Sequence, residues 1–128
     1  MPEAANGRFT FKVVFRNVGD DRGLAIHVYG PVASAENEVA TEEVLRFDCF
    51  EQQPHYHLAW SYRNDPFVRI DAQDPFEWAL SKLRGDMAGL LSGAGALPMN
   101  VDEAAALHTT LSSIEKQGRA IAEAAGTG

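Results

Sequence analysis

Hydrophobic and polar residues alternate one by one near the start of the chain. Residues 8–16 and residues 24–29 both show this period of two, and the segment between them is rich in turn-forming residues. Such alternation is typical of β-strands with one buried face. The two segments therefore predict a β-hairpin, with His27 opposite Lys12 if the turn is symmetric. The apolar side of the hairpin consists of Phe9, Phe11, Val13, Phe15, Leu24, Ile26 and Val28.

The same alternation returns in the middle of the chain. Residues 45–50 predict a third strand and residues 55–60 a fourth, joined by a four-residue turn at residues 51–54. Residues 67–70 are a candidate for a short fifth strand. The apolar side of these central strands includes Leu45, Phe47, Leu58 and Trp60.

The period changes to that of a helix after Asp74. Asp74 as N-cap, Pro75 in the first helical position and Glu77 three residues after the cap form a strong helix start. Asn100 and Glu103 repeat the capping pattern for a second helix. Apolar residues at helical spacing follow each start: Phe76, Leu80, Leu83, Met87 and Leu90 in the first helix, and Ala104, Leu107, Leu111, Ile114, Gly118 and Ile121 in the second.

An antiparallel meander followed by two amphipathic helices predicts an α+β fold. Both helical stripes need an apolar surface, and one face of a four- or five-stranded sheet supplies it, which gives a two-layer sandwich. The 128 residues have the length of a single domain. Residues 1–6 and residues 122–128 are expected to fray at its ends.

The chain has the features of a cytoplasmic protein. Its apolar runs are far shorter than the roughly 20 residues that cross a bilayer, and its first residues lack a basic flank and an apolar segment. We therefore expect neither membrane insertion nor secretion. The single cysteine, Cys49, cannot form an internal disulfide, and the alternation places it in the core, which fits a reducing compartment.

Charge argues against nucleic acid as a partner. The formal net charge is −7, and residues 36–75 contain nine acids and three arginines. Nucleic-acid binding depends on neutralisation of phosphates by Lys and Arg, which this balance opposes.

The polar positions of the predicted strands fall on the sheet face away from the helices. They are Lys12, Arg16, His27, Tyr29, Arg46, Asp48, His55 and His57. This face is either simply solvated or a binding surface. Our leading hypothesis is a non-catalytic domain that binds a small ligand, such as an anion, or a protein partner, and that forms a homodimer. The candidate ligand-binding residues are Arg16, His27, Tyr29, Arg46, Asp48 and His57.

His55 and His57 offer an alternative function. They lie on one side of a strand, about 7 Å apart at Cα, and the four-residue turn pairs Asp48 with His57 and Phe50 with His55. Two His and one Asp can hold a divalent metal and leave positions for water or substrate, as in a metal-dependent hydrolase or oxygenase. The preferred interpretation of this group is structural, with Asp48 hydrogen-bonding His57 across the hairpin.

The first helix carries a second candidate surface. Trp78, Gly85 and Gly89 fall on the side opposite the apolar stripe, at 100° per residue. Either another part of the chain packs against this ridge, or it is a subunit contact, since exposed aromatic patches often mark interfaces.

Two segments resemble a group of small bacterial proteins of unknown function. The first is Leu45-Arg46-Phe47-Asp48-Cys49-Phe50 with Pro54-His55-Tyr56-His57, and the second is Asp74-Pro75-Phe76-Glu77-Trp78-Ala79. The resemblance covers about the middle third of the chain and implies no activity, cofactor or catalytic residue. A cupin is excluded, because this sequence lacks the downstream Glu and the flanking glycines of that family's His-x-His pattern at suitable spacing.

Overall fold

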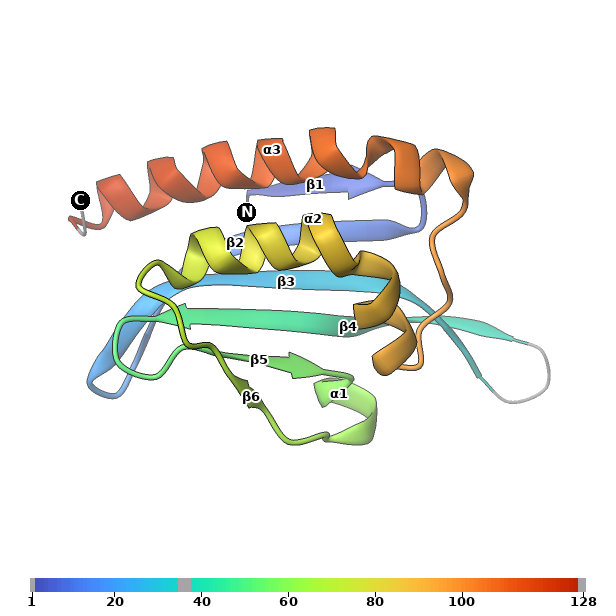
Figure 1. The fold of residues 1–128 in the computed structure, drawn as a ribbon, viewed down its shortest axis with the longest axis horizontal. Helices are drawn as coiled ribbons and strands as arrows, with labels where there is room; N and C mark the ends of the chain where they lie inside the picture. Colours follow the sequence, from blue (N-terminus) through green and yellow to red (C-terminus); the bar gives the residue numbers. More distant parts are fainter. Residues whose placement is uncertain (1, 35–37, 127–128) are drawn as a thin grey trace.

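The computed structural model describes residues 2–34 and 38–126. Over these residues the chain forms a six-stranded antiparallel sheet with two long helices on one face (Figure 1). The strands are neighbours in chain order: β1 (Glu3–Asn6), β2 (Phe9–Val18), β3 (Asp21–Ala33), β4 (Val39–Phe50), β5 (His55–Leu58) and β6 (Val68–Arg69). The helices are α1 (Trp60–Arg63), α2 (Pro75–Gly93) and α3 (Val101–Ala124). The predicted α+β class and the meander are confirmed, with more strands than the four or five expected.

Strands β2 and β3 form the predicted hairpin. Lys12 lies opposite His27, as a symmetric turn requires. The turn consists of Gly19 and Asp20, and Gly19 has a φ of 59°, a value that favours a residue without Cβ.

The chain ends are more ordered than predicted. Residues 3–6 form β1, which pairs with β2 and contacts α3 (Figure 1). The sequence Glu-Ala-Ala-Asn has low β-propensity, so the strand depends on its neighbours rather than on its own residues. Helix α3 continues through residues 122–124, which were also expected to fray. Residues 1 and 127–128 lie outside the described residues.

The predicted pairing of β4 with β5 is wrong by two residues. Asp48 lies opposite His55, and Arg46 lies opposite His57. The cause is Asp21, whose carboxylate accepts hydrogen bonds from the backbone N–H groups of Gln52 and Gln53, both at 2.9 Å. These bonds hold the residues after β4 against the β2–β3 turn. The connection between the last paired residues, Asp48 and His55, is therefore longer than the predicted four-residue turn.

Strand β5 is shorter than predicted. It ends at Leu58, and Ala59, with a φ of 58°, leads the backbone into α1. Residues 60–63 are therefore helical rather than extended. The predicted inward position of the Trp60 side chain lies outside what the structure describes.

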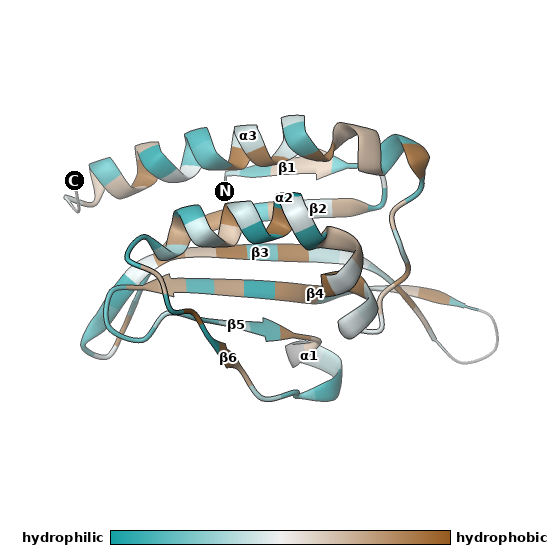
Figure 2. Ribbon diagram, viewed as in Figure 1, coloured by the Kyte–Doolittle hydropathy of each residue, from teal (hydrophilic) through white to brown (hydrophobic). Residues whose placement is uncertain are grey.

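The hydrophobic core lies between the sheet and the helices. Both N-caps form as predicted: Asp74 accepts from the N–H of Glu77, and Asn100 and Glu103 form a capping box. Helix α2 contacts β4, and α3 contacts β1 and β2, so the two helices divide the sheet between them. Apolar and polar residues alternate along the strands beneath the helices (Figure 2). Fully buried side chains from both layers include Phe9, Phe11, Phe47, Leu80, Leu83, Leu111 and Ile114.

Trp78 does not form the predicted ridge. Its ring lies 5.7 Å from that of Tyr56 and 6.5 Å from that of Phe47, centroid to centroid, so it packs on the helix-covered face of the sheet. The indole sits in the first turn of α2 and is long enough to reach β5 around the side of the helix. Gly85 and Gly89 are exposed, as expected for the side opposite the stripe.

A buried carboxylate fastens α3 to the β1–β2 turn. The Glu103 side chain is 2% exposed and accepts hydrogen bonds from Arg8 N at 2.7 Å, Arg8 Nη2 at 2.8 Å and Asn100 N at 2.9 Å. A Cβ on Gly7, whose φ is 59°, would collide with this carboxylate. The Arg8 side chain, helped by the backbone N–H groups, lowers the Glu103 pKa to about 2 although burial opposes this.

Replacing Glu103 should destabilise the protein measurably. Glu103→Gln keeps the size of the side chain but removes its charge, and we expect a loss of about 1–3 kcal/mol in the free energy of unfolding. The matched control is Asp102→Asn, an exposed acid in the same helical turn, which should cost about 0.5 kcal/mol through the helix dipole. Denaturant titration at pH 7 measures both. Equal losses in the two variants would contradict the role given to Glu103.

The Glu103 contribution should also depend on pH. In the folded protein its pKa is about 2, against an ordinary value of 4.5, so the unfolded chain takes up the proton first as the pH falls. The stabilisation is therefore present above about pH 4.5 and is lost between pH 4.5 and 2. Unfolding titrations across this range should show the difference between wild type and Glu103→Gln shrinking. A difference that stays constant would contradict this assignment.

Candidate functional site

The outer sheet face, opposite α2 and α3, collects the ionisable side chains of β2 to β5. We use this name for Lys12, Arg16, His27, Tyr29, Glu43, Arg46, Asp48, His55 and His57, which ion pairs and ring contacts join into one network. All eight residues predicted for this face are in the network. The candidate ligand-binding residues therefore lie together, whereas Gly85 and Gly89 lie away from them on α2.

Sequence reasoning missed Glu43 as a member of this face. A β-bulge between Val28 and Tyr29 in the pairing of β3 with β4 brings Glu43 opposite Tyr29. Val44 and Leu45 are in consequence both buried in the core, which breaks the strict alternation. The one local signal in the sequence was the run Glu42-Glu43-Val44-Leu45, where two acids and two apolar residues stand side by side and interrupt the alternation of a strand.

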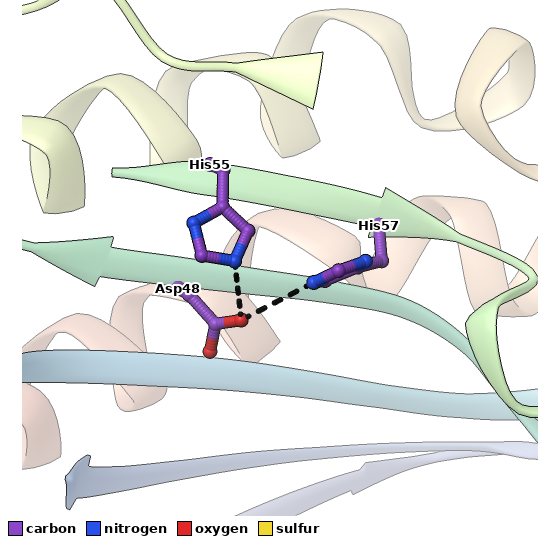
Figure 3. Close-up of side chains that lie close together, drawn as sticks. All are labelled: Asp48, His55 and His57. Atoms are coloured by element: carbon purple, nitrogen blue, oxygen red, sulfur yellow. Dashed lines mark ion pairs between the residues drawn. The ribbon is translucent and has the colours of Figure 1, made fainter. Parts of the chain in front are cut away.

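Asp48 is the centre of the outer sheet face. Its side chain is only 2% exposed, and its Oδ1 accepts a hydrogen bond of 3.3 Å from an Nη of Arg16. Its Oδ2 lies 3.1 Å from Nε2 of His55 and 3.5 Å from Nε2 of His57 (Figure 3). Arg46 Nε is 3.4 Å from the same oxygen. Strands β2, β4 and β5 thus each contribute a partner to one carboxylate.

A second acid pairs with the remaining histidine of the face. Nδ1 of His27 lies 2.7 Å from Oε2 of Glu43, and Nη1 of Arg46 lies 3.8 Å from Oε1. Burial alone would raise the Glu43 pKa, but His27, Arg46 and Tyr29 together lower it. Burial, followed by the charge of Glu43, raises the pKa of Tyr29. Glu43 is therefore an anion that links His27, Tyr29 and Arg46.

Burial lowers the pKa of His57, one of the two histidines beside Asp48. The charges of Arg46 and His55 lower this pKa further, and those of Asp48 and Glu43 oppose the shift. The neutral imidazole is consequently favoured at position 57.

Two phenylalanines border the histidines. The ring of Phe50 lies 5.8 Å from that of His55, and the ring of Phe67 lies 5.0 Å from His55 and 6.2 Å from His57. Phe50 is buried, but Phe67 is 55% exposed. His55 thus lies beside both phenylalanine rings, and His57 lies beside the ring of Phe67.

Shallow hollows lie along the outer sheet face. A hollow of 190 Å³ on β2 and β3 is lined by Lys12, Val14, Arg16, His27 and Tyr29. Another, of 350 Å³, lies beside His55 and is lined by residues of the β2–β3 turn and the β4–β5 connection. One hollow thus touches the Lys12 end of the network and the other touches His55.

The cysteine takes no part in this site. Cys49 is buried in the core, as predicted, and burial raises the pKa of its thiol. A thiol in this state is a poor nucleophile at neutral pH.

Comparison with known proteins places the chain in a family without indicating an activity. No match was found among curated proteins or among solved structures. Within the described residues, no helix has both the length and the apolar character needed to cross a membrane. The family described as "Domain of unknown function (DUF7700)" matches residues 3–118, and the chain belongs to that family.

Proposed function

We propose that this chain is a non-catalytic domain that binds a small anion on its outer sheet face. The observation that carries the proposal is the 190 Å³ hollow between Lys12 and Arg16. Among the described residues, its lining contains these two cations, His27 and Tyr29, and no carboxylate. In a chain of net charge −7, such a local concentration of cations favours an anion over other ligands.

The partners of the two cations support this proposal. The Lys12 ammonium lies 5.1 Å from the centre of the Tyr29 ring, which holds it over the hollow by a cation–π interaction. Arg16 uses one Nη for Asp48, and a guanidinium has five N–H donors in total. Both side chains therefore retain hydrogen-bonding capacity for a ligand.

The size of the hollow restricts the ligand class. Pockets for drug-sized molecules are about 300–1,000 Å³, larger than the 190 Å³ found here. Inorganic phosphate or a short carboxylate suits this volume.

Calorimetric titration with inorganic phosphate tests the proposal. Lys12→Ala should weaken binding about tenfold, because it removes one charge-assisted hydrogen bond. Lys12 is the better position to change than Arg16, because Arg16 also holds Asp48. The control is Lys116→Ala, an exposed lysine on α3, which should bind like wild type. Absence of binding at millimolar phosphate, or equal weakening in both variants, would refute an anion site at this hollow.

We also propose that the protein is a homodimer, and that its setting is the cytoplasm of a bacterium. Support for the dimer comes from β6 at the edge of the sheet, where Phe67 and Val68 are 55% and 43% exposed beside the outer sheet face. Exposed apolar side chains next to an edge strand suit contact with a second copy.

The single buried cysteine fits a reducing compartment.

Light scattering tests the dimer. Wild type should have twice the 13.9 kDa mass of the chain, and Phe67→Ser should shift the mass toward that of the monomer. The control is Val101→Ser at the start of α3, where the side chain is 84% exposed and far along the chain from β6. Wild type that remains at the monomer mass at every concentration would exclude the dimer.

A further inference from the structure

We propose that Asp48, His55 and His57 bind one divalent transition-metal ion, Zn²⁺ being the best match. One donor atom from each of the three lies within 4.8 Å of the other two. None of the three ligands lines the hollow between Lys12 and Arg16, so the metal proposal does not depend on anion binding there, although Arg16 contacts both sites.

The two donor distances that involve Asp48 match those of a tetrahedral zinc site. Zinc bonds to His nitrogen and carboxylate oxygen are about 2.0–2.1 Å, so two such ligands at a tetrahedral angle lie about 3.3 Å apart. Oδ2 of Asp48 lies 3.1 Å from Nε2 of His55 and 3.5 Å from Nε2 of His57 (Figure 3). Asp48 is therefore placed to share an ion with either histidine, and the donor nitrogens of the two histidines lie within 4.8 Å of each other.

The hydrogen bond on the far side of the His55 ring strengthens the proposal. Its Nδ1 lies 2.7 Å from the carbonyl oxygen of Gln53, which can only accept, so Nδ1 carries a proton. In a neutral ring, Nε2 then presents a lone pair toward the carboxylate of Asp48. Two electron-rich atoms 3.1 Å apart require a cation between them, either a proton or a metal ion. A ligating histidine in metalloproteins typically donates its other N–H to a carbonyl or carboxylate in this way.

Arg16 orients the carboxylate for the ion. It binds Oδ1 of Asp48, which leaves Oδ2 facing the two imidazoles. Arg46 lies near Oδ2 as well, at 3.4 Å, but it also pairs with Glu43 and keeps that partner when an ion takes Oδ2. Arg16 is therefore a positioning residue for the proposed ligand set.

The ligand types indicate which metals fit. Two imidazoles and one carboxylate suit Zn²⁺ or Fe²⁺, whereas Mg²⁺ and Ca²⁺ prefer oxygen ligands throughout. Three protein ligands leave coordination positions for water or a substrate. Of the three, His55 also lines the 350 Å³ hollow.

Metal titration of protein without a histidine tag tests the site. After removal of metals with a chelator, wild type should bind one Zn²⁺ per chain, and Co²⁺ in its place should give the visible absorption of a tetrahedral complex. His55→Ala and His57→Ala should each weaken binding at least about 100-fold, because loss of a mere outer-shell partner already costs 10–100-fold. The matched control is His108→Ala, an exposed histidine on α3, which should leave the affinity unchanged.

Folding of the variants is checked by circular dichroism and thermal unfolding. His55 is more exposed than His57, so His55→Ala keeps the test decisive if His57→Ala fails to fold. Zinc binding that is absent in wild type, or that survives in folded His55→Ala, would overturn the proposal. In that case a proton shared by His55 and Asp48 accounts for the geometry.

Phosphate titration of His55→Ala should give the wild-type affinity, which keeps the outcome separate from that of the anion hollow.

Discussion

The strongest constraint on this molecule is that successive side chains of a strand point to opposite faces of the sheet. Helices α2 and α3 cover one face, so most large apolar side chains of the central strands pack into the core, and the positions between them must be accommodated on the other face. The ionisable network on the outer sheet face is thus the complement of the hydrophobic core. Neither could change its spacing along a strand without disturbing the other.

Two acids are almost completely buried, and their surroundings differ in a way that separates structure from chemistry. Glu103 receives backbone N–H groups and one arginine, which fix it as a permanent anion at the start of α3. Asp48 is surrounded instead by side chains from three strands, two of them imidazoles. Imidazoles exchange protons and metal ions near neutral pH, whereas backbone amides do not. The proposed metal ion would therefore meet exchangeable partners at Asp48, whereas Glu103 has none of that kind.

Local signals in the sequence predicted much of the fold. The two-residue period gave the hairpin, and the caps at Asp74 and Asn100 gave both long helices. The features that were missed depend on contacts between distant segments. Strand β1 exists because β2 and α3 are beside it, and the β4–β5 register depends on Asp21, about thirty residues away from the amides that it binds. The outer sheet face was predictable as a set because it follows from alternation, and the sequence also grouped Asp48 with both histidines. That Asp48 lies opposite His55 rather than His57 follows from the register and was not predicted.

The bulge in the pairing of β3 with β4 has a consequence for how reproducibly the site is assembled. Val44 is the extra residue of β4, so the pairing of β4 with β3 is shifted by one residue between Leu45 and Glu43. The two strands therefore match in only one register. Slippage by one residue would send Glu43 beneath the helices and lift a core side chain into water, a costly exchange at both faces. The irregularity therefore locks the two longest strands against sliding, and every copy of the chain presents the same spacing of charges to a ligand.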